Sequence, residues 1–306
     1  MSTLPVLPPS RKSCTKSVHY NKRPTTNRQG SRLLLGLLFS SLIGLLAYRR
    51  RSLSRSGIAG AIVTGTTTFG LGGWTWGLSL IFFFVSSSLF SHFRAKDKTS
   101  IAEEKFSKGS QRDIAQVAAN GGVATIIALG YGTTSSPLMR QLLQASYVGV
   151  LATATADTWA TELGVLSPHN PRLITTGETT TPGTSGGVTP LGTGAAALGA
   201  LALGLFFWLL QGCRRALLPL PFIAFISGIA GSFFDSLLGA TVQLMHYCPL
   251  CHKETEQQLH HCGTKTRPLR GLPGMTNDTV NFLATLFGGL VAIVLQLPFL
   301  RSKPIH

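Results

Sequence analysis

Long apolar stretches recur along the whole sequence, and they constrain its fold more than any other feature. Several approach about twenty residues, the length that an α-helix needs to cross a hydrocarbon layer of about 30 Å. Hydropathy predicts eight spans, at residues 33–48, 57–70, 74–92, 114–131, 142–161, 194–210, 218–245 and 280–299. The second is short and rich in Thr and Gly, so it also suits a half-span or a re-entrant segment. The sequence therefore predicts an all-α, polytopic membrane helix bundle with about eight transmembrane helices, within a range of about seven to nine.

The charge composition supports the same class of protein. Only 12% of the residues are Asp, Glu, Lys or Arg, about half the share in a typical soluble domain. The 27 Lys and Arg outnumber the 11 Asp and Glu. In a soluble protein this excess would suggest nucleic acid, but basic loops between apolar spans follow from the positive-inside bias and from anionic lipid head groups. We therefore expect a lipid bilayer as partner and no nucleic acid.

The chain divides into a tail and one membrane domain. Residues 1–30 are basic and rich in Pro, Ser and Thr, which predicts a disordered tail. This composition suits an organellar transit peptide or a bacterial juxtamembrane tail, so a plastid membrane and a bacterial inner membrane both stay open. Residues 31–300 form a single integral membrane domain, and residues 246–272 form a Cys/His loop within it. If all eight spans cross, the main polar loops share one face, which their Lys and Arg make cytoplasmic. The basic tail would then lie on the opposite side, so either the first span does not cross or the tail breaks the rule.

Four acids lie in or at the ends of the predicted spans, namely Asp157, Glu162, Asp235 and Asp278. A carboxylate at the bilayer centre costs about 2.5–3.5 kcal/mol on insertion scales, so its presence requires a partner or a function. We expect a metal ion, a proton or a ligand, although a hydrogen bond to a neighbouring Ser or Thr would also satisfy a packed Asp. A regular helix places Asp157 and Glu162 about 140° apart. Either the helix unwinds and they converge, or one of them pairs elsewhere.

Amide and basic side chains accompany these acids. Asn277 and Asn281 lie one turn apart at the start of the last span and offer oxygen ligands that suit Mg²⁺. Asn277 is equally suited to cap the helix. Asn120 shares a polar stripe of the fourth span with Arg112. Lys108 and Arg112 lie just outside the membrane, where they would hold phosphate oxygens or contact lipid head groups.

A glycine-rich loop precedes the sixth span. It contains Thr184, Ser185, Gly186 and Gly187. Backbone N–H groups beside a helix start bind anions, and glycine lets a phosphate approach them closely. No Lys follows these glycines, so the loop is not a Walker A motif. It predicts a phosphate-binding segment only in combination with other polar groups.

The Cys/His loop carries a possible structural zinc site. Cys248 and Cys251 are followed about ten residues later by His260, His261 and Cys262. Three thiolates and one imidazole at this spacing are typical of a zinc knuckle. We predict Cys248, Cys251, His261 and Cys262 as the ligands, although the loop lacks a second Cys-x-x-Cys pair.

Five ordered motifs together resemble one protein family. They lie at residues 113–122, 154–164, 183–188, 231–243 and 277–281. The sequence resembles the transmembrane protein 19 family, which includes the phytyl-phosphate kinase of plants and cyanobacteria. The resemblance extends over roughly residues 32–299, and the Cys/His loop departs from the pattern of the plant enzymes.

The resemblance implies an integral membrane transferase of isoprenoid metabolism. Its reaction would be that of a prenyl-phosphate kinase, which transfers a phosphoryl group from CTP or ATP to phytyl or a related prenyl monophosphate. Phosphoryl transfer relies on metal-mediated charge neutralisation and alignment. The metal-binding and catalytic acids would then be Asp157, Glu162, Asp235 and Asp278, supported by Asn120, Asn277 and Asn281. The nucleotide phosphates would contact Lys108, Arg112 and the Thr184–Gly187 loop. The alternative is an ion- or proton-coupled transporter that uses the same buried acids.

Overall fold

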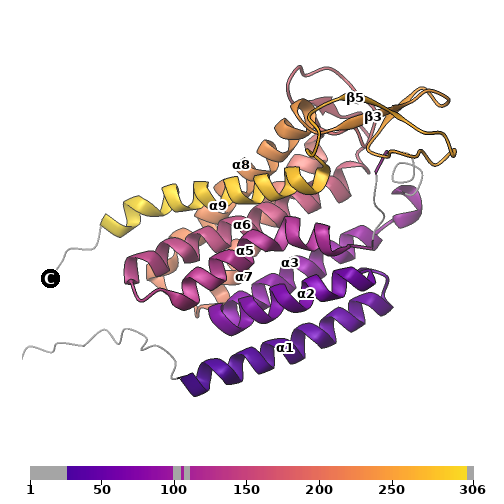
Figure 1. Cartoon of the computed structure of the whole chain (residues 1–306). Helices are drawn as coiled ribbons and strands as arrows, with labels where there is room; N and C mark the ends of the chain where they lie inside the picture. Colours follow the sequence, from indigo (N-terminus) through magenta and orange to yellow (C-terminus); the bar gives the residue numbers. More distant parts are fainter. Residues whose placement is uncertain (1–25, 99–104, 107–110, 302–306) are drawn as a thin grey trace, which may run out of the picture.

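The computed structural model describes residues 26–98, 105–106 and 111–301. Its helices follow the predicted spans in order: α1 (Thr26–Arg49), α2 (Arg55–Thr67), α3 (Trp74–His92), α5 (Ile114–Thr133), α6 (Pro137–Gly164), α7 (Pro190–Leu210), α8 (Pro219–Thr241) and α9 (Asn277–Arg301). Helix α2 continues directly into a π-helical turn, η1 (Thr68–Gly72). A 3₁₀ turn, η2 (Arg215–Leu217), precedes α8. Figure 1 shows the elongated bundle that these helices form. The predicted helical membrane fold is confirmed.

Within the described residues, six helices are long and apolar enough to cross a membrane: α1, α3, α5, α7, α8 and α9. The chain is therefore an integral, multi-pass membrane protein. Helix α1 begins at Thr26, so residues 26–30, which we assigned to the tail, belong to its first turns. The rest of the predicted tail, residues 1–25, lies outside the described part of the chain.

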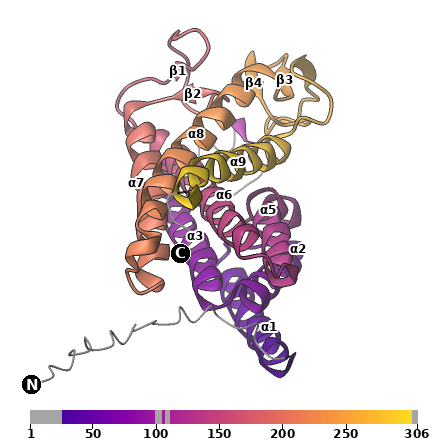
Figure 2. The ribbon, with the colours of Figure 1, turned by 90° about the vertical axis from the view of Figure 1, so that its left-hand side faces the viewer.

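Helix α6 is the centre of the bundle. It packs against α3, α5, α7, α8 and α9, and Figure 2 shows it between its neighbours. Every residue from Ala145 to Ala156 is buried, and most of them are Ala, Gly, Ser, Thr or Val. Small side chains permit such close approach between helices where lipid supplies no hydrophobic drive. Because α6 contacts protein on all sides, it tolerates polar residues that a lipid-facing helix would exclude.

The loops after α1, α3, α6 and α8 gather at one end of the bundle, which we call the loop face. Leu53 pairs with Arg112 there in a short parallel bridge, and the backbone N–H of Glu256 donates to the carbonyl of Lys105 at 2.9 Å. The start of α1 and the end of α9 lie at the opposite end (Figure 1). The shared face of these loops agrees with the predicted alternation of spans, whereas its cytoplasmic orientation stays a prediction.

The loop face carries two small antiparallel sheets that the sequence interpretation did not include. Strands β1 (Arg172–Leu173) and β2 (Gly187–Val188) form a pair in the α6–α7 connection. The Cys/His loop forms a three-stranded sheet in the order β4–β3–β5, from β3 (Met245–Cys248), β4 (Lys253–Thr255) and β5 (Arg267–Arg270). The two sheets lie at the same end of the bundle in both views (Figures 1 and 2).

Candidate functional site

A polar pocket lies where α6, α7 and α8 reach the loop face. It encloses about 870 Å³ of space, part of it open to solvent, and acids, hydroxyls, glycines and one amide are among the residues that line it. These lining residues are Asp157, Thr161, Thr184, Ser185, Gly186, Gly187, Ser232, Asp235, Ser236, Glu256 and Asn277. Among the described lining residues there are three carboxylates and no Lys or Arg. The pocket therefore has the electrostatic character of a cation site.

The close crossing of α6 and α8 places two of these carboxylates. A Cβ atom on Gly231 would collide with the side chain of Thr153, so the two helix backbones pass at close range. Asp157 and Asp235 each follow that contact by four residues, which is about one helical turn. Both acids therefore point from adjacent helices into the same space. They lie about 9–11 Å from the helix ends at 1.5 Å per residue, which is less than half of a hydrocarbon layer of about 30 Å, so both lie in the half of the bundle next to the loop face.

The two carboxylates differ in their hydrogen bonding. The Ser232 hydroxyl is a hydrogen-bond partner of Asp157. The Oδ2 atom of Asp235 is buried and has no hydrogen-bond partner among the described residues. Asp235 is also close enough to Asp157 and Glu256 to be repelled by both. A buried carboxylate oxygen without a partner is costly, so this cluster favours a bound cation.

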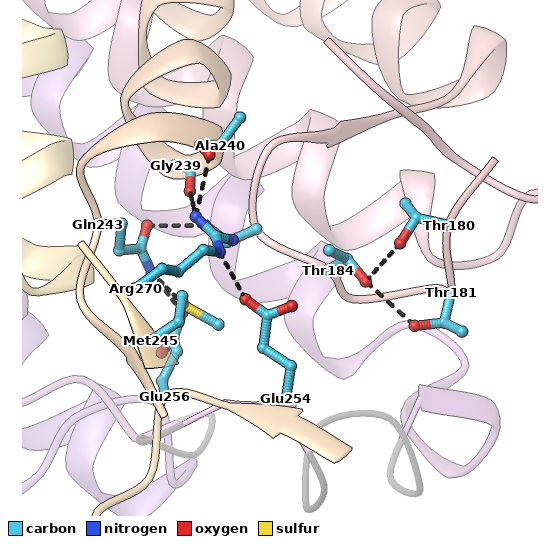
Figure 3. Close-up of polar contacts among 11 residues, drawn as sticks. Thr180, Thr181, Thr184, Gly239, Ala240, Gln243, Met245, Glu254, Glu256 and Arg270 are labelled. Atoms are coloured by element: carbon cyan, nitrogen blue, oxygen red, sulfur yellow. Dashed lines mark hydrogen bonds and ion pairs between the residues drawn. The ribbon is translucent and has the colours of Figure 1, made fainter. Parts of the chain in front are cut away.

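Glu256 is the third carboxylate, and the sequence analysis missed it. It follows β4 directly and comes from the Cys/His loop rather than from a helix. Gln243 Nε2 donates to Glu256 Oε1 at 2.9 Å, and Gln243 Oε1 accepts from Ser185 Oγ at 2.8 Å. A single side chain therefore links the acid to the glycine-rich loop. Figure 3 shows Gln243 and Glu256 side by side.

The glycine-rich loop is fixed against the end of α8. Gly186 has a φ of +83°, and a Cβ atom there would come within 2.6 Å of the Ala240 backbone. A side chain at this position would be both strained and blocked. The Thr184 hydroxyl contacts the hydroxyls of Thr180 and Thr181 at 3.1 Å each (Figure 3). The loop thus forms one wall of the polar pocket, and its role in binding phosphate stays a prediction.

Arg270 joins the three-stranded sheet to the same helix end. Its Nη1 donates to the carbonyls of Gly239 and Ala240, each at 3.0 Å, and its Nε pairs with Glu254 Oε1 at 2.8 Å (Figure 3). A cation here also interacts favourably with the negative end of the α8 dipole. The sheet that carries Glu256 is therefore attached to the helix that carries Asp235.

Glu162 lies outside the polar pocket. Its Oε1 accepts from Ser91 Oγ at 2.5 Å and its Oε2 pairs with Lys98 Nζ at 2.7 Å. Lys98 Nζ also donates to the carbonyl of Phe90 at 2.6 Å. Because α6 stays regular, Glu162 faces α3 and Asp157 faces α8. Of the two alternatives drawn from the sequence, the structure therefore has the one in which the helix stays regular, with Asp157 at the pocket and Glu162 paired elsewhere.

Arg112 and Asn120 line a second, apolar cavity among α1, α2, α3 and α5, with about 810 Å³ of space. The Arg112 guanidinium lies 5.7 Å from the Phe84 ring centroid, and its Nη1 is buried without a hydrogen-bond partner among the described residues. Burial lowers the pKa of Arg112 below its ordinary value, and the nearby Glu162 partly opposes this effect. Neither Arg112 nor Asn120 contributes to the polar pocket.

The remaining predicted residues are distributed around the pocket. Asn277 lines it, whereas Asp278 and Asn281 in the first turns of α9 are not among its described lining residues. Lys108 lies outside the described part of the chain. The pocket therefore combines Asp157, Asp235, Asn277 and the glycine-rich loop.

The Cys/His loop brings together four metal-type ligands, with all ligand atoms within 4.8 Å of one another. They are Cys248, Cys251, His260 and Cys262. The imidazole is thus that of His260, whereas the sequence predicts His261, whose ring is tilted by 50° against that of His260 with the ring centroids 4.1 Å apart. Hydrogen bonds from Thr264 and from His260 lower the pKa of Cys262 to about 5.

The polar pocket includes one acid that no short motif identified. Glu256 lines the pocket and accepts a hydrogen bond from Gln243, which belongs to the 231–243 motif. One signal was available for Glu256, because it is one of only 11 acids in a strongly basic chain and lies inside the Cys/His loop. Its connection to helices α6 and α8 could not be read from the spacing of residues.

Comparison with known proteins identifies the family. The sequence model described as "Integral membrane protein DUF92" matches residues 38–289. The chain is 33% identical to Protein PGR of Arabidopsis thaliana over 83% of this chain and 93% of that protein. It is 28% identical to an uncharacterized membrane protein of Methanocaldococcus jannaschii, over 86% of this chain and 94% of the relative. An uncharacterized membrane protein of Synechocystis is 26% identical over 85% and 89%. No solved structure matches the chain.

Proposed function

This chain belongs to the DUF92 family of integral membrane proteins, and we propose that it is a membrane-embedded prenyl-phosphate kinase. The observation that carries the proposal is the convergence of Asp157, Asp235 and Glu256 on one pocket beside a glycine-rich loop. Phosphoryl transfer needs aligned phosphates and neutralised charge more than it needs reactive side chains. A pocket of fixed acids near the membrane surface suits a substrate with a lipid tail and a phosphate head.

The donor set of the pocket fits Mg²⁺. Carboxylate oxygens are hard ligands, and Mg²⁺ in kinases is usually bound by one or two carboxylates together with phosphates and water. The buried Oδ2 of Asp235 has no partner among the described residues, which leaves it available for such a cation. Asp157, Asp235 and Glu256 would hold the ion, which, when bound, neutralises the charge on the transferring phosphoryl group.

The glycine-rich loop and Asn277 would position the phosphates of CTP or ATP. An acceptor phosphate oxygen attacks the γ-phosphorus while the bond to the β–γ bridging oxygen breaks, so the products are a prenyl diphosphate and a nucleoside diphosphate. The acceptor monophosphate is already an anion at neutral pH, because the second pKa of a phosphate monoester is about 6. No side chain is therefore needed as a general base.

Phe233 offers a route for the prenyl tail. It lines the polar pocket, and 40% of its surface is exposed. Since α8 is a membrane-crossing helix, an apolar side chain at this position connects the pocket with the lipid phase. A prenyl chain would remain in the bilayer along α8 while its phosphate enters the pocket from the side.

The test is a transfer assay with the purified full-length chain in nanodiscs. The assay contains γ-labelled CTP or ATP, Mg²⁺, and phytyl or geranylgeranyl monophosphate. We expect labelled prenyl diphosphate from the wild type. Asp235→Asn should lower the transfer rate by at least about 100-fold, because even changes to residues that only support a metal ligand cost about 10–100-fold. Glu178→Gln is the matched control, since Glu178 is an exposed acid on the same face.

Two results would contradict the proposal. The first is that no phosphate is transferred to any prenyl monophosphate although the protein is folded. The second is that Asp235→Asn turns over at the wild-type rate. Ion-dependent uptake into proteoliposomes without phosphate transfer would instead support the transporter, in which the same acids carry cations or protons.

A further inference from the structure

The Cys/His loop contains four ligands that nothing in the phosphoryl-transfer proposal uses. We propose that Cys248, Cys251, His260 and Cys262 bind one structural Zn²⁺ ion, and that this ion holds Glu256 in the polar pocket. The metal-binding part stands independently. Only its consequence for turnover rests on the proposed function.

Two distances in the cluster are close to those of tetrahedral coordination. Cys248 Sγ and Cys262 Sγ are 3.7 Å apart, and two thiolates at about 2.3 Å from a tetrahedral Zn²⁺ are about 3.8 Å apart. A disulfide would require a separation of about 2.05 Å. His260 Nδ1 lies 3.2 Å from Cys262 Sγ, close to the edge of about 3.5 Å expected between nitrogen and sulfur ligands of one zinc ion.

The backbone around the first two cysteines has a compact turn. The N–H of Cys251 donates to Cys248 Sγ at 3.5 Å, and the N–H of His252 donates to the carbonyl of Cys248 at 2.9 Å. His252 has a left-handed φ of 54°, so the chain reverses at once into β4. The turn places the second thiol beside the first and leaves both sulfur atoms on the same side as His260.

The sheet that contains this cluster lacks an apolar core of its own. The leucines of the Cys/His loop point outward: Leu250, Leu259, Leu269 and Leu272 are 65%, 64%, 52% and 56% exposed. The buried side chains of the loop are His246, Cys248, Thr255, His260 and Thr266, which are polar or small, and Met245 at the start of β3 is the large apolar side chain buried beside them. Segments that cannot bury enough apolar surface depend on a disulfide or a metal for a fixed structure. The Nε2 atom of His260 is also buried without a partner among the described residues.

Glu256 lies between this cluster and the polar pocket. It follows β4, which pairs with β3 through Cys248 and Lys253. On the C-terminal side of Glu256, Thr266 Oγ1 donates to the carbonyl of Gln257 at 2.7 Å. Thr266 directly precedes β5, so this hydrogen bond connects the Glu256 segment to the chain that follows His260 and Cys262. Releasing the metal would therefore loosen the turns on both sides of Glu256. Its backbone N–H would still donate to the carbonyl of Lys105, so we expect the side chain of Glu256 to lose its fixed contact with Gln243 while this backbone contact remains.

Metal content and local order provide the test. Protein purified without added metal should contain about one zinc per chain by elemental mass spectrometry, as expected for a closed site with four ligands. His260→Ala should reduce zinc retention by about tenfold or more. His261→Ala and Cys213→Ser are the matched controls, because neither residue belongs to the cluster, and both should keep their zinc. Hydrogen exchange across residues 249–266 should increase only in His260→Ala.

The possible outcomes are distinct. Absence of zinc, or a Cys248–Cys262 disulfide in the purified protein, would overturn the inference. Equal zinc loss in His260→Ala and His261→Ala would also overturn the assigned ligand set. If zinc binds as expected while the wild type shows no transfer, the zinc site stands and the kinase proposal fails. If transfer persists in zinc-free protein with increased exchange, the connection between the metal and Glu256 is wrong.

Discussion

The side chain of Thr153 on α6 packs directly against the backbone of Gly231 on α8. The same threonine also faces Gly288 on α9, where a Cβ atom would collide with it as well. Three helices therefore meet at one small-residue contact, one turn away from Asp157 and Asp235. The separation of the two carboxylates depends on this contact, because a wider crossing would move them apart.

Gly231→Ala should therefore lower both stability and transfer. Overpacking of a filled interior costs about 1–3 kcal/mol of unfolding free energy, which would appear as a lower thermal midpoint in detergent. Adding Thr153→Ala should recover part of the loss, because it removes the colliding atoms. Gly194→Ala is the control, since nothing lies within 4 Å of its added Cβ. A Gly231→Ala protein as stable as the wild type would show that the crossing is not close.

The helices could be predicted from the sequence because hydropathy and length are local properties. The spans at 74–92 and 114–131 correspond almost residue for residue to α3 and α5. The central position of α6 was harder to predict. Its many Thr and Ala residues are compatible with burial among helices, but they do not tell which helices surround it. The small sheets could not be predicted, because the strands are short and Arg172 and Val188 pair across a loop without alternating apolar and polar residues.

Asp157 and Glu162 should behave differently although they lie on the same helix. Asp157→Asn removes a carboxylate of the polar pocket, so we expect the loss of transfer with little change in stability. Glu162→Gln removes the ion pair with Lys98, whose side chain is 9% exposed. We expect it to retain transfer and to lose about 1–3 kcal/mol of stability, less than a fully buried pair would.

A double-mutant cycle with Lys98→Met checks this assignment. If Glu162 and Lys98 stabilise the protein mainly through each other, the double variant should lose less than the sum of the two single losses. Thermal midpoints and transfer rates of the four proteins provide the measurement. Abolished transfer in a well-folded Glu162→Gln protein would restore Glu162 to the site.

Gln243 is a positioning residue, and its effect should appear in the metal dependence. Gln243→Leu keeps much of the side-chain volume but removes the donor to Glu256 and the acceptor for Ser185. Loss of such supporting hydrogen bonds weakens metal binding by about 10–100-fold. The Mg²⁺ concentration for half-maximal transfer should rise accordingly, and excess Mg²⁺ should restore the rate. Gln258→Leu is the control, because Gln258 is exposed, and it should leave the Mg²⁺ dependence unchanged. If Gln243→Leu is slower than the wild type but has the same Mg²⁺ dependence, Gln243 has a packing role only.

The candidate site could be predicted only in part, for a physical reason. Asp157 and Asp235 were identifiable because a charge within an apolar helix is costly wherever the helix lies. Glu256 carries no such signal, since an acid in a polar loop is ordinary. The choice between His260 and His261 depends on which ring faces the thiols, and adjacent residues in an irregular loop give no periodicity that would decide it.

Phe233 should affect the prenyl tail and not the phosphate chemistry. Its ring lines the pocket and is partly exposed, so Phe233→Ala should remove apolar contact with a long chain bound there. A loss of about 40 Å² of contact at about 25 cal/mol per Å² is about 1 kcal/mol, or about a fivefold higher KM. We expect this change for phytyl monophosphate, with kcat nearly unchanged, and no change for a five-carbon prenyl monophosphate.

Phe222→Ala is the control, because Phe222 is 58% exposed near the other end of α8. Equal KM changes for the long and short acceptors would place the tail elsewhere, since a contact made only by the distal chain cannot alter the binding of a substrate that lacks it.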